Sequence, residues 1–224
     1  MSALFITSTG TEIGKSFVAR GLIRHLRDRG RAVDALKPVV SGFRASTVAA
    51  SDSGLLLAAL GKPTAMHEIE RISPWRFVAP LSPDLAARRE DRHIDFDELV
   101  DFCRRAVAQA SDVVLIEGVG GVMVPLDDRH TVLDWMSALG LPTILVVGNY
   151  LGTLSHTLTA LDVLLRRGLS VASVIVNETD ATKSLEDNAR TIARFASGIE
   201  VLELPRLRRH SFQHPTFVQI TERL

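Results

Sequence analysis

The chain has 224 residues, of which 46% are hydrophobic and 23% charged, a composition typical of globular proteins. Its 26 Lys and Arg residues balance 26 Asp and Glu residues, so it lacks the net positive charge that draws proteins to nucleic acid or anionic membranes. The single cysteine, Cys103, excludes an intramolecular disulfide, and its apolar neighbours predict a buried side chain. No apolar run approaches the roughly 20 residues that span a bilayer, and the N-terminus does not resemble a signal peptide. We therefore expect one cytoplasmic domain over residues 1–224, with no nucleic-acid or membrane partner.

Short apolar segments alternate with helical segments along the chain. Residues 3–7 are predicted to form a strand, and residues 15–30 a helix that ends at Gly30, because apolar residues recur there on one face. Further strands are predicted at 32–37, 112–117, 142–148, 170–177 and 200–204, and further helices at 95–109, 131–139, 153–167 and 184–196.

Several of the predicted strands are nearly continuous apolar runs, which are typical of strands covered by helices on both faces. The alternation predicts a doubly wound, mostly parallel α/β sheet, in which ligands bind beyond the carboxyl ends of the strands. Residues 61–94 hold four prolines and form the least regular stretch, so we expect them to wrap the surface or shape the rim of a pocket. The tail 208–224 has too little periodicity for a prediction.

The strongest chemical signal is STGTEIGKS, residues 8–16, between the first strand and the first helix. Such a loop can surround phosphates with backbone N–H groups at a helix N-terminus. Lys15 would reach the outer phosphates, and the Ser16 hydroxyl would bind Mg²⁺. The usual phosphate-loop motif is G-x-x-x-x-G-K-[ST]. We assign its first glycine to position 8, where this chain has Ser8, and Gly10 is out of register with that position. The alternative is a flexible turn with an exposed lysine.

Two carboxylates are candidates for a nucleotide-bound magnesium ion, which takes only one or two of them. Glu117 ends the strand 112–117 and is followed by a glycine-rich turn, although it could be an ordinary strand-end carboxylate. Asp52 precedes an apolar helical stretch, and its local sequence favours a helix N-cap.

Two further polar residues end predicted strands. Lys37 could face a transferred phosphate as a point charge, or it could simply face solvent. Asn177 could bind the edge of an adenine, or it could form a turn. His156 stays unassigned, and Trp75, Phe77 and Trp135 are interpreted as packing or pocket-wall residues.

An ordered set of segments from residue 3 to about residue 207 resembles the dethiobiotin synthase family. The most specific of these segments are KPVVSG (37–42) and EGVGGVMVPL (117–126). The others include TGTEIGKS (9–16), SPWRFVAPLSP (73–83), TVLDW (131–135), VVGNYLGTLSHTL (146–158), VIVNE (174–178) and LPRL (204–207). Ser8 departs from the family's first loop glycine, and Gly10 stands where many members have aspartate.

The resemblance implies a P-loop NTPase fold, a homodimer and closure of a ureido ring. One amine of 7,8-diaminononanoate captures CO₂ as a carbamate, and a carbamate oxygen attacks the γ-phosphate of ATP. The second amine then attacks the carbonyl carbon of the mixed anhydride and expels phosphate, which gives dethiobiotin. ATP and Mg²⁺ are the implied cofactors.

The family also implies roles for individual residues. Lys15 and Lys37 would be catalytic, and Ser16, Asp52 and Glu117 would hold the metal. Nucleotide-binding residues would be Glu12, Ile13, Gly14, Lys15, Ser16, Phe17, Asp52, Glu117, Gly118, Val119, Gly120, Asn177, Pro205, Arg206 and Leu207. Substrate-binding residues would be Thr11, Ser41, Tyr150, Leu151 and Ser155, the last three at a site completed across the dimer interface.

A second hypothesis is a regulatory ATPase switch of the chromosome-partitioning or division-site type. Those proteins usually carry an early second lysine in the loop, where this chain has Ser8, Thr9 and Gly10. They also often end in an amphipathic membrane-binding segment, which this tail does not resemble. A third hypothesis is an amidotransferase-linked synthase. That class of enzyme needs a second domain with a nucleophilic cysteine, whereas the single cysteine of this chain, Cys103, is predicted to be buried.

Overall fold

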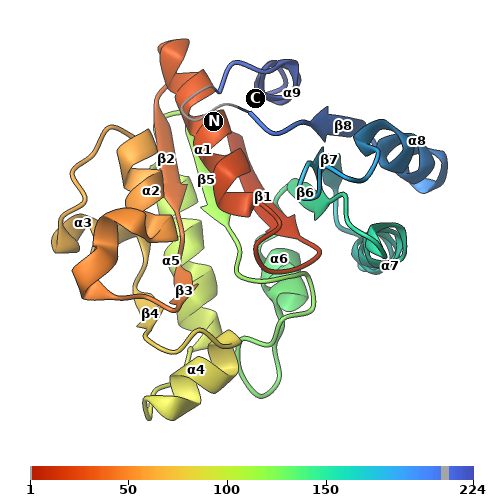
Figure 1. The fold of residues 1–224 in the computed structure, drawn as a ribbon. Helices are drawn as coiled ribbons and strands as arrows, with labels where there is room; N and C mark the ends of the chain where they lie inside the picture. The colour runs from red at the N-terminus through yellow and green to blue at the C-terminus, as the bar shows by residue number, and fades with distance from the viewer. Residues whose placement is uncertain (1, 208–211) are drawn as a thin grey trace.

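A computed structural model describes residues 2–207 and 212–224 of the chain. Its centre is a parallel sheet with the strand order β2-β5-β1-β6-β7-β8 (Figure 1). The strands are β1 (Ser2–Ser8), β2 (Val33–Leu36), β5 (Val113–Glu117), β6 (Thr143–Gly148), β7 (Val171–Asn177) and β8 (Val201–Leu204). Two short strands, β3 (Val39–Ser41) and β4 (Trp75–Phe77), pair in parallel as a second sheet.

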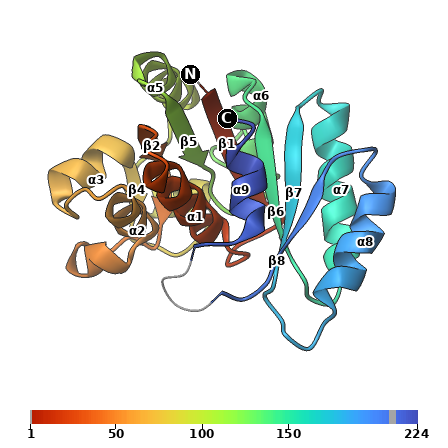
Figure 2. The same cartoon turned by 90° about the horizontal axis from the view of Figure 1, so that it is seen from above.

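Helices cover both faces of the central sheet. They are α1 (Lys15–Asp28), α2 (Asp52–Ala59), α3 (Met66–Ile72), α4 (Pro83–Arg89), α5 (Phe96–Gln109), α6 (Val132–Leu139), α7 (Thr153–Arg166), α8 (Leu185–Phe195) and α9 (Pro215–Thr221), with a 3₁₀ segment η1 (Ala45–Ala50) before α2. The connection from β1 to β2 runs across the sheet in one direction, and the later connections run in the opposite direction. Because such crossovers are right-handed, α1 lies on one face of the sheet and α5 to α8 lie on the other. In agreement, α1 contacts α2 and α9, and α7 contacts α8 (Figure 2).

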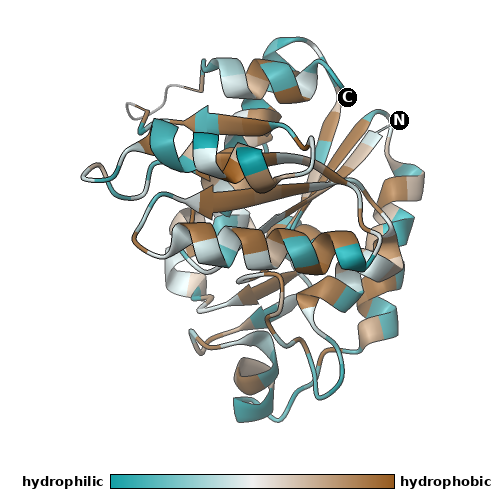
Figure 3. Ribbon diagram, turned by 90° about the vertical axis from the view of Figure 1, so that its right-hand side faces the viewer, coloured by the Kyte–Doolittle hydropathy of each residue, from teal (hydrophilic) through white to brown (hydrophobic). Residues whose placement is uncertain are grey.

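The core is formed by the central strands together with the helix faces that pack on them, and the strands carry hydrophobic residues along much of their length (Figure 3). Every residue of β5 and β6 is buried, as expected for strands covered on both faces. Trp135 and Phe77 are fully buried packing residues. Cys103 is also fully buried, and this burial raises its pKa to about 12, which makes it an unreactive thiol.

The structure confirms the doubly wound fold and the predicted strands and helices, with ends that differ by one or two residues. The irregular stretch 61–94 contains α3, β4 and α4, none of which was predicted. Each of these elements has seven residues or fewer, too short for a clear hydrophobic period, and tertiary contacts therefore decide their structure. The expectation that this stretch forms a pocket rim is confirmed, since Pro80 and Pro83 line a cavity of about 610 Å³ at the carboxyl edge of the sheet.

The C-terminal segment forms a helix that the sequence did not predict. α9 docks on α1, and a Cβ atom at Gly21 would lie 2.2 Å from the ring of Phe217, so only glycine allows this close approach. Thr216 also donates a hydrogen bond to the Glu203 carbonyl oxygen at 2.6 Å. The two ends of the chain meet, since Ser2 Oγ lies 2.8 Å from the carbonyl oxygen of Leu224.

We expect Asp134→Asn to destabilise the fold in a pH-dependent manner. Burial alone would raise the pKa of Asp134, but hydrogen bonds from Arg167, which directly follows α7, and from Thr131 lower it to about 2. Because the folded pKa lies below the ordinary value of 3.8, this stabilisation exists above pH 4 and disappears as the pH falls toward 2. The free energy of unfolding of the variant should be about 2 kcal/mol lower than that of the wild type at pH 6. Chemical denaturation at several pH values measures this loss, and a loss that stays constant down to pH 2 would contradict the prediction.

Candidate functional site

The carboxyl ends of β1, β2 and β5 meet at one edge of the sheet and open into a cavity of about 610 Å³. This edge is where ligands bind in doubly wound folds. The lining residues are Thr11, Glu12, Gly14, Lys15, Ser16, Phe17, Lys37, Val40, Ser41, Asp52, Pro80, Leu81, Ser82, Pro83, Glu117, Val119, Gly120 and Val124. The structure thus brings both catalytic lysine candidates and all three metal-ligand candidates into one cavity.

The loop between β1 and α1 has the backbone that a phosphate-binding loop needs. Gly14 precedes α1 with a φ of 107°, and a Cβ atom there would lie 2.3 Å from Nδ2 of Asn177. Only glycine allows both this backbone angle and this approach. Lys15, Ser16 and Phe17, the first residues of α1, line the cavity, so the N-terminus of this helix faces it.

The first position of the strict G-x-x-x-x-G-K-[ST] motif, counted back from Gly14, is Thr9. The sequence interpretation assigned this position to Ser8, one residue too early. Neither residue is glycine, so the departure from the motif stands, but its location in the strict motif is corrected to Thr9.

Lys15 is the first residue of α1, and its buried ammonium group lies inside the loop. Its Nζ donates to Ser8 Oγ at 3.0 Å and to the Gly10 carbonyl oxygen at 3.1 Å. Burial and then the nearby charge of Lys37 lower the pKa of Lys15 to about 8, so it is mostly charged at neutral pH. The alternative of an exposed lysine on a flexible turn is excluded.

Glu117 joins the loop to the neighbouring strand end. Its Oε1 accepts hydrogen bonds from Ser16 Oγ at 2.7 Å and from Lys37 Nζ at 2.9 Å. Lys37 also donates to the Gly118 carbonyl oxygen at 2.5 Å and is only 2% exposed. The alternative of a solvent-facing Lys37 is therefore excluded, and Glu117 is a buried carboxylate paired with Lys37 and Ser16.

The second oxygen of Glu117 is the feature that best fits a bound cation. Glu117 is 1% exposed, and no residue within 2–207 or 212–224 forms a hydrogen bond with its Oε2. A buried carboxylate oxygen without a partner is costly. With the Ser16 hydroxyl beside it, this oxygen offers the hard ligands that Mg²⁺ prefers.

Asp52 lies at the cavity edge, with its Oδ2 3.8 Å from Lys37 Nζ and its side chain 45% exposed. It is the first residue of α2 and not its cap. Ser51 is the cap, since its hydroxyl accepts from the N–H of Gly54 at 3.1 Å. The local interpretation of Asp52 as an N-cap is therefore wrong, and its carboxylate remains available to the cavity.

Several predicted site residues lie outside the lining of this cavity. Ile13 is buried beneath the loop, and its carbonyl oxygen accepts a 2.9 Å hydrogen bond from Asn177 Nδ2. Gly118 contributes its carbonyl oxygen to Lys37. The remaining ones are Asn177, Pro205, Arg206 and Leu207, at the ends of β7 and β8, and Tyr150, Leu151 and Ser155, after β6.

The loop after β6 stands apart from the cavity within one chain. Tyr150 bonds through its hydroxyl to Nδ1 of His156 at 2.8 Å, which gives that unassigned histidine a packing partner. Leu151 is 88% exposed, so its side chain projects away from the protein.

Asn149 is a structural residue of this edge that sequence reasoning missed. It is fully buried, and its Nδ2 donates to the carbonyl oxygens of Asp180 at 2.9 Å and Lys183 at 3.1 Å. Its Oδ1 accepts from the N–H groups of Thr179 and Asp180, both at 2.8 Å. This one amide therefore fixes the loop after β7 to the end of β6. No local sequence signal could have identified it, because its partners lie about 30 residues away.

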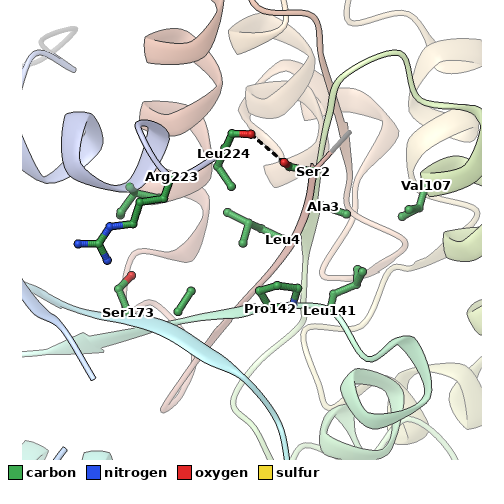
Figure 4. A pocket seen from close by; sticks show the side chains of 11 residues that line it. Ser2, Ala3, Leu4, Val107, Leu141, Pro142, Ser173, Arg223 and Leu224 are labelled. Carbon is green, nitrogen blue, oxygen red and sulfur yellow. Dashed lines mark hydrogen bonds between the residues drawn. The ribbon is translucent and has the colours of Figure 1, made fainter. Parts of the chain in front are cut away.

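A second cavity of about 470 Å³ lies at the opposite, amino-terminal edge of the sheet (Figure 4). Its lining is mostly aliphatic and includes Leu4, Val107, Leu141 and Pro142. Arg223, the one charged side chain among the described residues that line it, pairs with Glu200 at 2.6 Å. The carboxyl-edge cavity, which is lined by Lys15, Lys37, Asp52 and Glu117, is therefore better suited to phosphate chemistry than this one.

Solved structures share this fold at low sequence identity. The septum site-determining protein MinD from Pyrococcus horikoshii, complexed with Mg-ADP, aligns with a TM-score of 0.57 and 18% identity over 99% of this chain and 95% of its own. The MinC:MinD cell division complex from Aquifex aeolicus aligns with a TM-score of 0.54 and 14% identity over 100% of this chain and 86% of its own. At such identities the likeness shows the fold alone.

Sequence relatives are much closer. A family model described as an AAA domain matches residues 2–212. The ATP-dependent dethiobiotin synthetase of Acidiphilium cryptum is 52% identical over 79% of this chain and 80% of its own length. That of Methylobacterium nodulans is 47% identical over 90% of this chain and 92% of its own length. This chain belongs to the ATP-dependent dethiobiotin synthetase family.

Proposed function

We propose that this protein is the ATP-dependent ligase that closes the ureido ring of dethiobiotin, in biotin biosynthesis, and that the cavity at the carboxyl edge is its active site. The observation that carries the proposal is the convergence of two buried lysines, Lys15 and Lys37, beside a buried carboxylate, Glu117. Phosphoryl transfer requires charge neutralisation and positioning more than covalent help from the protein. A site with these groups supplies both.

The lysines act on the transferred phosphoryl group. An uncharged amine of 7,8-diaminononanoate adds to CO₂ and loses a proton, which gives a carbamate. A carbamate oxygen attacks the γ-phosphorus of ATP and ADP leaves, while Lys15 and Lys37 balance the negative charge that develops. The second amine attacks the carbonyl carbon, loses a proton and expels phosphate, which closes the ring. Thr11, Glu12 and Ser41 line the side of the cavity on which the carbamate and diamine would lie.

Ser16, Asp52 and Glu117 would hold the magnesium ion of Mg-ATP. The Oε2 of Glu117, which has no hydrogen-bond partner among the described residues, and the Ser16 hydroxyl, which binds the other oxygen of the same carboxylate, support this assignment. When bound, the ion neutralises charge on the outer phosphates. The residues themselves fix the ligand oxygens, since Lys37 and Ser16 both hold Glu117 in place.

The base of ATP would bind beyond the loop, against Asn177 and the segment 205–207. The hydrogen bond from Asn177 to the carbonyl oxygen of Ile13 supports this assignment, because it places the amide directly beside the phosphate loop. Glu178 accepts a 2.7 Å hydrogen bond from the N–H of Arg206, which joins the ends of β7 and β8. Glu12 to Phe17, Gly118, Val119 and Gly120 would complete the nucleotide site.

The carboxylate of the diamine would bind Tyr150, Leu151 and Ser155 of a second copy of the chain. Leu151 is 88% exposed, so this part of the loop after β6 is accessible to a second copy of the chain, which is consistent with such a homodimer. Light scattering tests the homodimer, and a monomer at assay concentrations would contradict it.

A single domain over residues 1–224 and a cytoplasmic location are part of the proposal. Within 2–207 and 212–224, none of the helices has the length and apolar character needed to span a membrane.

The test of function is phosphate release from Mg-ATP with bicarbonate, with and without 7,8-diaminononanoate. We expect release to depend on the diamine and to match the dethiobiotin formed, measured by mass spectrometry. The alternative is a regulatory ATPase switch. Release that ignores the diamine would support that alternative and contradict the ligase.

A further inference from the structure

Ser8, the last residue of β1, is fully buried, and its hydroxyl contacts three parts of the candidate active site. Ser8 Oγ lies 2.5 Å from the Gly10 carbonyl oxygen and 3.2 Å from the Gly10 nitrogen, within the phosphate loop. It lies 3.1 Å from the Gly120 carbonyl oxygen, in the loop after β5, and 3.0 Å from Lys15 Nζ. One oxygen atom thus joins the turn, the opposite loop and the buried lysine.

The chemistry of a hydroxyl matches these contacts. A serine has one proton to donate and two lone pairs to accept with. It can donate to the carbonyl oxygen of Gly10 or of Gly120, and accept from the Lys15 ammonium and the Gly10 N–H. The bond from Lys15 is charge-assisted, which makes it stronger than a bond between neutral groups. A glycine at this position would leave the lysine without one of its two hydrogen-bond acceptors.

We propose that Ser8 is a positioning residue for the phosphate-binding lysine: its hydroxyl holds the Lys15 ammonium and the turn at Gly10 in the arrangement that receives the outer phosphates of ATP. This inference rests on the role proposed above for Lys15. A lysine side chain has many rotamers, and fixing it before ATP binds removes part of the entropy loss on binding.

A purely structural role is the competing explanation, and the neighbouring residue provides a matched control. Thr7 lies on the same strand and is also fully buried, but its hydroxyl has no hydrogen-bond partner among the residues that the structure describes. Thr7→Val therefore removes a buried hydroxyl at nearly constant volume without touching the loop. Ser8→Ala also removes a buried hydroxyl, but this hydroxyl has hydrogen bonds with Gly10, Gly120 and Lys15.

The experiment compares the dissociation constants of Mg-ATP and AMP for the wild type, Ser8→Ala and Thr7→Val by calorimetry. AMP lacks the outer phosphates, so it does not report on Lys15. We expect Ser8→Ala to weaken Mg-ATP binding about tenfold, as for loss of one hydrogen bond to a charged group, and to leave AMP binding within about twofold. Thr7→Val should leave both within about twofold. In steady state, Ser8→Ala should raise KM for ATP and leave KM for the diamine unchanged.

Two results would overturn the inference. One is wild-type affinity for Mg-ATP in Ser8→Ala; the other is an equal loss of affinity for Mg-ATP and for AMP, which would indicate a general distortion of the site.

Lys15→Ala separates failure of this inference from failure of the proposed function. If Lys15→Ala weakens Mg-ATP binding and Ser8→Ala does not, only the role of Ser8 is lost. If Lys15→Ala binds Mg-ATP like the wild type, the proposed role of Lys15 fails, and the inference about Ser8 fails with it.

Discussion

Lys37→Ala should lower kcat for dethiobiotin formation by about 10²- to 10³-fold, the usual loss when one preorganised electrostatic group is removed from an active site. Its affinity for Mg-ATP should stay within a few-fold of the wild type, because in the proposed site Lys15 and the loop backbone would still hold the nucleotide. The structure supports this division of roles. The ammonium of Lys37 lies on the Glu117 side of the cavity, whereas Lys15 lies inside the loop. Single-turnover kinetics and calorimetry measure the two quantities separately.

The stability of the variant needs its own measurement. Lys37 is the counter-ion of Glu117, and breaking a buried ion pair can cost about 3–5 kcal/mol. Thermal denaturation shows whether Lys37→Ala is folded at the assay temperature. Lys62→Ala is the control, because Lys62 pairs with Asp34 at a side-chain exposure of 35%, so its loss should change neither turnover nor affinity. Unchanged turnover in folded Lys37→Ala would remove this lysine from the mechanism.

The sequence was most informative where one local pattern determines the structure. β5 and β6 are continuous apolar runs, and such runs are buried wherever a doubly wound sheet forms. The loop 8–16 carries a glycine-lysine-serine motif between a strand and a helix, and this motif in this context predicted that Lys15 and Ser16 face a ligand edge. Glu117 was predictable for the same reason, since the ends of adjacent parallel strands share that edge.

The rest of the site depends on contacts between distant segments, which local patterns do not encode. Asp52 approaches Lys37 after the chain has passed through β3 and η1, so their proximity depends on how these segments fold back. Asn149 binds a loop about 30 residues away, and nothing near it in the sequence distinguishes it from a turn-forming asparagine. Ser8 was noted only as a missing glycine, although its hydroxyl is a contact point between three segments.

The short elements were missed for a related reason. α9 has seven residues, so its helical period is hardly visible in the sequence, and its docking depends on the fit between Phe217 and Gly21. The short strands β3 and β4 pair with each other through only three residues each. Such elements gain their stability from tertiary packing more than from intrinsic propensity.

Glu117→Gln should remove most of the magnesium dependence of nucleotide binding. The substitution keeps the size of the side chain and an oxygen that Ser16 and Lys37 can bond, but it removes the negative charge. We expect the wild type to bind a non-hydrolysable ATP analogue more tightly with Mg²⁺ than with EDTA, and this ratio to fall about 10- to 100-fold in the variant. Binding in EDTA should be unchanged or tighter, because a negative charge beside the triphosphate is gone.

Calorimetry with the analogue, in Mg²⁺ and in EDTA, measures both effects without any turnover. Glu203→Gln is the matched control, because Glu203 is an exposed carboxylate on β8 and lies outside the cavity lining. A loss of affinity that is equal in Mg²⁺ and EDTA would mean that Glu117 shapes the loop without contributing to the cation site. An unchanged ratio of the affinity in Mg²⁺ to the affinity in EDTA would mean that Oε2 of Glu117 does not bind the cation. The metal ligands from the protein would then be Asp52 and Ser16 alone.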